Sequence, residues 1–166
     1  MVSIETMHLL IRRAAPFDAD AIGRLAAEFQ EYLRAQGSMA DYTWDADAYL
    51  RDGFGADPAF EGMVAELDGV LVGFALYHFG YDTDRGQRLL YMIDLFVTEG
   101  ARGQGVGQAL MARLTEVGQA RGAELIAWSV LTENRSAREF YERQGARYVE
   151  DQYTMWRAGH TCQTHA

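Results

Sequence analysis

A glycine-rich segment that follows an apolar run is the part of the sequence best suited to chemistry. Residues 89–97 are apolar except for Asp94, and the letters RGQGVGQ follow at positions 102–108. A junction of this kind between a strand and a helix presents free backbone N–H groups and the positive end of the helix dipole, while glycines let a phosphate approach the main chain. Arg102 adds a cation beside these groups. The segment therefore indicates a pyrophosphate-binding turn, with a tight turn that binds nothing as the alternative.

The spacing of the glycines excludes two common phosphate-binding motifs. A P-loop requires Gly-Lys followed by Ser or Thr, whereas Gly107 is followed by Gln108 and Ala109. The dinucleotide-binding fingerprint requires a third glycine three positions after its second one, but Gln108 stands three positions after Gly105. Neither a P-loop nor a Rossmann-type site is therefore expected.

Asp94 is another residue that could take part in a reaction. It interrupts an apolar run that is typical of a central strand covered on both faces. Burial disfavours the charged carboxylate and would raise its pKa towards the range useful to a general base. The alternative is a structural carboxylate bonded to the backbone or to a water. His78, on the preceding expected strand, and a relay of water from bulk solvent are the other candidates for a base.

Apolar periodicity, turn signals and helix caps predict the elements that must position these residues. Strands are expected at residues 8–13, 63–67, 70–79, 89–97, 125–130 and, once or twice, within 148–156. Helices are expected over residues 18–37, 46–51, 103–122 and 134–145, with Asp18 or Asp20 capping the first and Asn134 the last. The order predicts a mixed α/β domain with an antiparallel front half over residues 1–157, followed by a flexible polar tail at 158–166.

Composition and charge narrow the class of protein. The 166 residues are 49% hydrophobic and 23% charged, which is typical of a globular protein with one core. A net charge of −9 disfavours nucleic acid and anionic membranes as partners and favours a cationic substrate. Cys162 is the only cysteine, so neither an intrachain disulfide nor a cysteine-based metal site is expected. Without a leader-like N-terminus or an apolar stretch of about 20 residues, a cytoplasmic location is expected.

Two ordered motifs resemble the GNAT acetyltransferase superfamily. Its acetyl-CoA signature is Arg or Gln, two residues, Gly, one residue, and Gly or Ala, and it is matched by Arg102, Gly105 and Gly107. The family's second pattern, after the next expected strand, is resembled by Asn134, Ala137, Phe140, Tyr141 and Gly145. The resemblance implies the GNAT fold, a mostly antiparallel mixed sheet flanked by helices, with splayed strands that hold coenzyme A.

The same resemblance implies an acetyl-CoA-dependent N-acetyltransferase that works by direct transfer. The strand before the turn would pair with the pantetheine amides through Leu95 and Val97, and an N–H near Phe96 or Val97 would polarise the thioester carbonyl. The residues expected to bind the cofactor are Leu95, Phe96, Val97, Arg102, Gly103, Gln104, Gly105, Val106, Gly107, Gln108 and Asn134.

Tyr141 and Asp94 are the expected catalytic residues. Resemblance to the family's Phe-Tyr pair implies that the Tyr141 hydroxyl lies near the CoA sulfur and protonates the departing thiolate. The alternative for Tyr141 is an amphipathic core residue whose hydroxyl bonds to the backbone. Asp94 would serve as the base, with His78 and a water relay as the alternatives already named.

The middle of the chain resembles diamine (spermidine/spermine-type) acetyltransferases and their thialysine-acetylating relatives, through pieces such as the letters DGFG at 52–55. In that subfamily acidic residues line the amine channel, and Asp82 and Asp94 match two of them, with His78 as a third substrate-binding candidate. The family's Glu before Asp94 is Ile93 here, and its aromatic residue after Asp82 is Asp84. A lysine-like amino acid is therefore a rival to a polyamine as the small cationic substrate.

Three further expectations concern partners and competing functions. A homodimer is expected from the resemblance, with strands around residues 153–156 pairing or swapping between subunits. An enzyme that acetylates a protein N-terminus or lysine would share every cofactor feature. A non-catalytic module that only senses acetyl-CoA is the remaining alternative, and Tyr141 argues against it.

Overall fold

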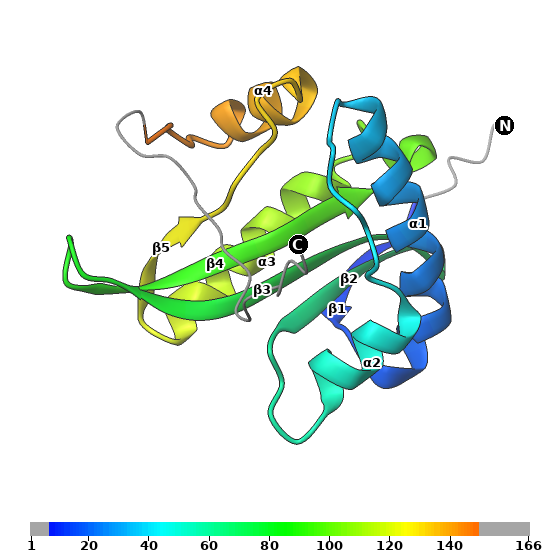
Figure 1. The fold of residues 1–166 in the computed structure, drawn as a ribbon, viewed down its shortest axis with the longest axis horizontal. Coiled ribbons are helices and arrows are strands. Elements are labelled where there is room, and N and C mark those ends of the chain that lie inside the picture. Colours follow the sequence, from blue (N-terminus) through cyan, green and yellow to red (C-terminus); the bar gives the residue numbers. More distant parts are fainter. Residues whose placement is uncertain (1–6, 150–166) are drawn as a thin grey trace, which may run out of the picture.

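Short apolar runs separated by turn signals form one five-stranded sheet in the computed structural model, which describes residues 7–149 (Figure 1). The strands are β1 (Leu9–Arg13), β2 (Glu61–Leu67), β3 (Val70–Asp82), β4 (Gln87–Val97) and β5 (Ala123–Ala127), and they lie in the sheet in this order. The first four are antiparallel neighbours, whereas β5 is parallel to β4. The predicted α/β class with an antiparallel front half is confirmed.

Three amphipathic helices of the described chain cover this sheet: α1 (Ala19–Ala35), α2 (Ala46–Phe54) and α3 (Val106–Ala120). A fourth, α4 (Arg135–Arg143), packs beside the core under α3. Helices α1 and α2 lie on one face and α3 on the other (Figure 1). Two short 3₁₀ turns, Pro16–Asp18 and Glu99–Ala101, precede α1 and the glycine-rich turn. None of the helices in residues 7–149 is long and apolar enough to cross a membrane.

Each face of the sheet buries its own apolar core. The core beneath α1 and α2 contains Ile22, Leu25, Tyr49, Phe60, Val64, Phe74, Leu76 and Phe96. The core beneath α3 contains Met63, Ala65, Ala75, Tyr77, Leu90, Met92, Leu110 and Leu114. The two sets alternate along β2 and β3, as the two-residue period of a strand requires.

A β-bulge in β4 interrupts this alternation and changes the face of the sheet on which Asp94 lies. Leu76 pairs with Asp94 but Tyr77 pairs with Met92, so Ile93 is an extra residue on β4. Met92 points to the α3 core, whereas Asp94, opposite Leu76, lies on the face covered by α1 and α2. Without the extra residue Asp94 would follow Met92 onto the α3 face.

Several predicted elements differ from the structure in their ends. Asp18 does not cap α1 through its side chain, because its buried carboxylate binds Arg12 at 2.7 and 2.8 Å and accepts from the Ala15 N–H. β3 and β4 extend beyond the expected strand ends at 79 and 89, to Asp82 and from Gln87, since the hairpin turns only at 83–86. β5 ends at Ala127, so residues 128–130 are not strand. The strands expected within 148–156 and the tail at 158–166 lie outside the described residues, except that 148–149 are not strand.

Other predictions of the local structure are confirmed. Asp68 and Gly69 form the β2–β3 turn, both with positive φ. Asn134 caps α4 by accepting a hydrogen bond from the Ala137 N–H at 3.2 Å. At the Asp68-Gly69 turn and at the Asn134 cap, the local conformation is one that only a few residue types favour.

Candidate active site

The open edge of β4 is the first component of the site. β5 pairs with β4 only from Arg88 to Tyr91, and β4 then continues to Val97 with β3 alone. The N–H of Thr98 bonds to the carbonyl of Val72, and bonding alternates along an antiparallel pair. The N–H and C=O groups of Leu95 and Val97 therefore point to the side from which β5 has departed. Such an edge can pair with the amides of an extended ligand.

The glycine-rich turn is the second component. Gly103 and Gly105 have φ of 74° and 82°, which favours glycine, and a Cβ on either would meet no atom within 4 Å. The first intrahelical bond of α3 comes from the N–H of Ala109 to Gly105, which leaves the N–H groups of the preceding helix residues for a ligand. The turn is therefore an open concavity of donors suited to a pyrophosphate.

Gly107 and Gln104 contribute differently from the other residues of the motif. A Cβ on Gly107 would lie 3.3 Å from the Phe140 ring, so this glycine permits close packing between α3 and α4. The Gln104 side chain donates to the carbonyl of Gly100 at 2.8 Å, and the residue does not line the cavity described below.

Arg102 is held by three partners beside the turn. Its Nε donates to the carbonyl of Val97 at 2.9 Å, and its guanidinium lies over the rings of Tyr32 and Phe96, 4.7 and 5.6 Å from their centroids. The guanidinium therefore adds a fixed positive charge where the expected phosphates would lie.

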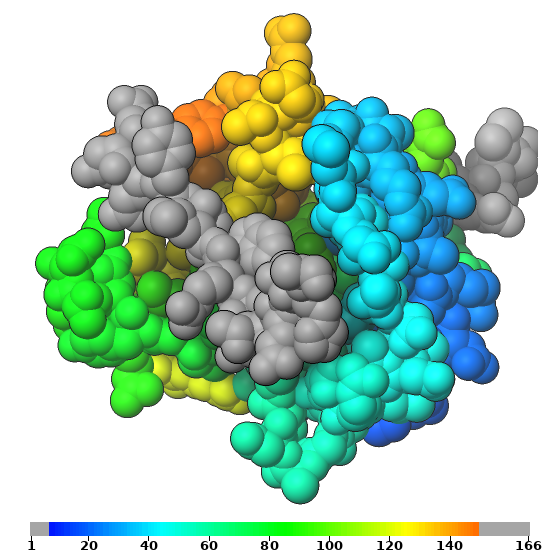
Figure 2. Space-filling model, viewed as in Figure 1, coloured from blue at the N-terminus to red at the C-terminus, as the bar shows by residue number. Residues whose placement is uncertain are grey.

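These components border one cavity of about 810 Å³. Its other walls are the end of α1, the segment between α1 and α2, the segment after β5, and α4. Figure 2 shows the α1–α2 segment lying against the segment that precedes α4. Of the residues expected to bind cofactor, the cavity is lined by Leu95, Phe96, Val97, Arg102, Gly103, Gly105, Val106, Gly107, Gln108 and Asn134.

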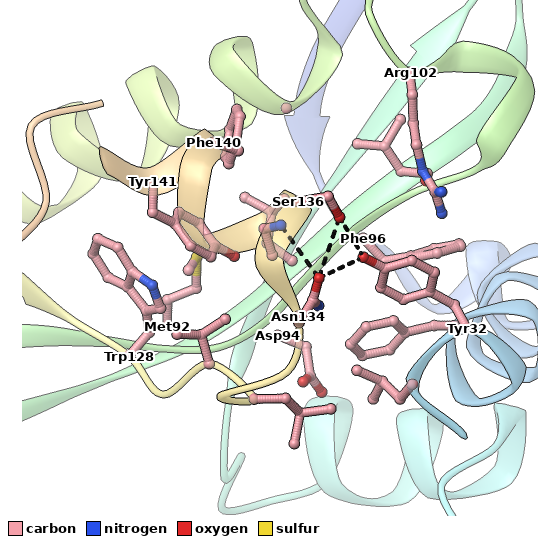
Figure 3. Close-up of a pocket in the computed structure, with 18 of the residues that line it drawn as sticks. Tyr32, Met92, Asp94, Phe96, Arg102, Trp128, Asn134, Ser136, Phe140 and Tyr141 are labelled. Atoms are coloured by element: carbon pink, nitrogen blue, oxygen red, sulfur yellow. Dashed lines mark hydrogen bonds between the residues drawn. The ribbon is translucent and has the colours of Figure 1, made fainter. Parts of the chain in front are cut away.

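Tyr141 lines this cavity from α4 (Figure 3). Its ring packs against Trp128 and Phe140, with centroids 4.8 and 5.2 Å away. Its hydroxyl has no hydrogen-bond partner among residues 7–149, which argues against the structural alternative. Burial, together with the nearby Asp94 and Tyr32, raises the pKa of the hydroxyl above its ordinary value. Tyr141 therefore keeps its proton at neutral pH and offers it to the cavity.

Asp94 lines the same cavity from the bulged part of β4 (Figure 3). Its carboxylate has no hydrogen bond or ion pair within the part of the chain that the structure describes. Burial raises the pKa of Asp94 to about 6, because desolvation disfavours the charged form. A carboxylate with this pKa can take a proton at neutral pH.

The structure does not bring His78 and Asp82 to the cavity. His78 is exposed and stacks on the Tyr91 ring, with centroids 5.3 Å apart. Asp82 accepts from the backbone and side chain of Arg85, and these bonds lower the pKa of its carboxyl. Asp82 thereby fixes the β3–β4 turn. A role for either residue with substrate stays a prediction.

Tyr32 is a cavity residue that the sequence analysis missed. It lies on α1, and its hydroxyl donates to Asn134 Oδ1 at 2.8 Å and lies 3.1 Å from Ser136 Oγ (Figure 3). Its spacing of three residues from Phe29, on the apolar face of the helix, was the available signal. An aromatic residue with a polar tip at such a position often faces a wet cavity.

The chain is similar to known proteins in sequence and in fold. The model of the acetyltransferase (GNAT) family matches residues 21–146. Thialysine N-epsilon-acetyltransferase of Sus scrofa is 34% identical over 148 residues, 84% of each chain. Spermidine/spermine N(1)-acetyltransferase-like protein 1 of Homo sapiens is 33% identical over 82% of this chain and 20% of its own length. An aminoglycoside N-acetyltransferase solved in complex with CoA shares the fold, with a TM-score of 0.76 at 20% identity over 95% and 99% of the chains.

Proposed function

The chain belongs to the GNAT family and is an acetyl-CoA-dependent N-acetyltransferase, and from this premise we propose that it acetylates a primary amine of a small cationic substrate. One observation carries the proposal. Asp94 and Tyr141, two proton-carrying groups without protein partners in residues 7–149, face one cavity beside the open edge of β4.

Different residues of the chain would hold the cofactor and move the protons during the transfer. When bound, acetyl-CoA supplies an activated acetyl thioester. The open edge at Leu95 and Val97 and the turn at Gly103 and Gly105 are the groups that would hold it. Asp94 Oδ accepts the proton that the attacking amine must lose, and the Tyr141 hydroxyl donates one to the leaving group.

The role of Asp94 predicts a specific pH dependence. Only the ionised carboxylate can accept a proton, so activity should rise as the pH rises through about 6. Dividing the wild-type rate by the Asp94→Asn rate cancels the ionisation of the amine itself. We expect this ratio to fall about tenfold per pH unit below 6 and to level off above it. A ratio that is flat from pH 5 to 8 would assign the base to water.

A small cationic substrate is supported by the cavity walls and by the names of the relatives. Ser38 and Tyr42, from the segment between α1 and α2, form part of one wall of the cavity, and this wall would limit the size of the acceptor. Asp94 is the only carboxylate among the described residues that line it. A single carboxylate suits a substrate with a net charge of about +1, so we favour a lysine-like amino acid, whose own carboxylate offsets its second ammonium, over a polyamine.

Ile93 should set this preference between amines. It is 38% exposed and lines the cavity next to Asp94. Ile93→Glu should raise kcat/KM for spermidine relative to lysine about 1.4-fold to fivefold, because an added carboxylate attracts the more highly charged polyamine by about 0.2–1 kcal/mol more. Ile93→Gln is the matched control without charge. Equal ratios for the Glu and Gln variants would show that Ile93 does not face the amine.

A turnover screen tests the function as a whole. Acetyl-CoA consumption would be measured with amino acids, polyamines, aminoglycosides and peptides at equal concentration. We expect the highest kcat/KM with small cationic amines. A preference for peptides would favour a protein acetyltransferase, and CoA binding without turnover on any amine would favour a sensor. The expected homodimer stays a prediction, because residues 153–156 lie outside the described part.

A further inference from the structure

Tyr32 joins three parts of the cavity through one side chain. From α1 its hydroxyl bonds to Asn134 and contacts Ser136 at the start of α4. Its ring carries the guanidinium of Arg102, and both pack against Phe96 of β4. The hydrogen bond between Tyr32 and Asn134 joins the end of α1 to the segment before α4.

The hydroxyl of Tyr32 is the shortest of three contacts that fix how the Asn134 amide is turned. Asn134 Oδ1 receives three donors: Tyr32 at 2.8 Å, and the Ala137 N–H and Ser136 hydroxyl at 3.2 Å each. The amide nitrogen is thereby directed away from these groups. It has no partner among residues 7–149, and none of the described polar side-chain atoms is both fully buried and unpaired. Asn134 Nδ2 is therefore a free donor that reaches the cavity.

The ring of Tyr32 determines where the Arg102 guanidinium lies. Arg102 is an exposed residue, and such side chains ordinarily sample many rotamers. Here Nε donates to the Val97 carbonyl and the guanidinium lies over the Tyr32 ring. No partner for its terminal NH₂ groups occurs in the described part of the chain. They stay available beside the turn at Gly103 and Gly105.

We propose that Tyr32 is a positioning residue for acetyl-CoA, which fixes the Asn134 amide through its hydroxyl and the Arg102 guanidinium through its ring. Both groups are then oriented before the ligand arrives, so binding loses less conformational entropy. The inference rests on the proposed function, because it concerns the acetyl donor of that reaction.

Binding of CoA alone, measured by calorimetric titration without any amine, tests this proposal. Tyr32→Phe removes the hydroxyl and keeps the ring, and it should raise the Kd for CoA about fivefold, the value of one hydrogen bond. Asn134→Ser keeps a good helix cap but removes the amide, and it should raise the Kd at least as much. The double variant should bind no more than about twofold more weakly than Asn134→Ser, because Tyr32 acts through Asn134. Tyr32→Leu also removes the platform for Arg102 and should add a further twofold to fivefold.

Tyr49→Phe is the matched control for a merely structural hydroxyl. Tyr49 is fully buried, and its hydroxyl donates to the carbonyl of Ala15 at 2.8 Å, away from the cavity. This variant should lower the melting temperature and leave the Kd for CoA unchanged. An unchanged Kd in Tyr32→Phe, or independent effects in the double variant, would overturn the positioning role. Failure of the wild-type protein to bind CoA would instead overturn the proposed function as well.

Discussion

Tyr141→Phe is expected to lower the rate of acetyl transfer by about 10²- to 10⁴-fold, the usual contribution of a general acid. The leaving thiolate needs a proton, and the hydroxyl faces the cavity with its proton retained at neutral pH. The affinity for acetyl-CoA should change little, since the ring still packs on Trp128 and Phe140. Single-turnover kinetics would measure the chemical step separately from product release.

The stability of the same variant distinguishes catalysis from packing. Because the Tyr141 hydroxyl has no hydrogen bond within residues 7–149, its removal should leave the free energy of unfolding nearly unchanged. A structural hydroxyl would instead cost about 1 kcal/mol. If Tyr141→Phe kept more than about half of the wild-type single-turnover rate, Tyr141 would not be the acid.

Gly105→Glu is expected to weaken acetyl-CoA binding by on the order of a hundredfold or more. The new carboxylate would compete for the N–H groups at the start of α3 and repel the phosphates, and two lost charge-assisted hydrogen bonds are worth about 1.5–3 kcal/mol each. Calorimetric titration of the folded variant with acetyl-CoA measures the effect.

Gly69→Glu controls for the strain of this substitution. Gly69 also has a φ of 82°, and a Cβ there likewise meets no atom within 4 Å, but it lies in the β2–β3 turn. Both variants place a glutamate in left-handed backbone, at about 1–2 kcal/mol, so both should lose similar stability. Only Gly105→Glu should lose acetyl-CoA. Equal affinities of the two variants for acetyl-CoA would show that its phosphates do not bind at the turn that contains Gly105.

The sequence predicted the parts of the site that depend on local backbone chemistry. Glycines at 103 and 105 indicated a turn at the start of a helix, where the structure has positive φ, and Asn134 indicated a cap, because few residue types satisfy these conformations. The apolar run at 89–97 indicated a buried strand, and the one charge in it indicated Asp94. The match to the GNAT family over residues 21–146 confirms the family resemblance that was drawn from the glycine-rich motif and the Asn134 motif.

The parts that the sequence could not predict depend on contacts between distant segments. Ile93 is no different from its neighbours in the run, so the bulge that turns Asp94 towards α1 is invisible without the partner strand. Asp18 or Asp20 was expected to cap α1, but the Asp18 carboxylate pairs instead with Arg12 of β1. The contact of Tyr32 with Asn134 spans 102 positions, and local periodicity contains no information at that distance.

The open edge of β4 also bears on how this protein avoids aggregation. Unpaired N–H and C=O groups on a strand are a template for a strand of another molecule, and proteins usually shield or charge them. Here the N–H and C=O of Leu95 and the N–H of Val97 lie inside the fold without a strand partner in residues 7–149, whereas the Val97 carbonyl accepts from Arg102; the start of α3, α4 and the end of α1 lie around them. A slender chain bearing amides can reach them, whereas a second sheet cannot. The fold thus keeps a surface for β-type pairing while denying it to other proteins.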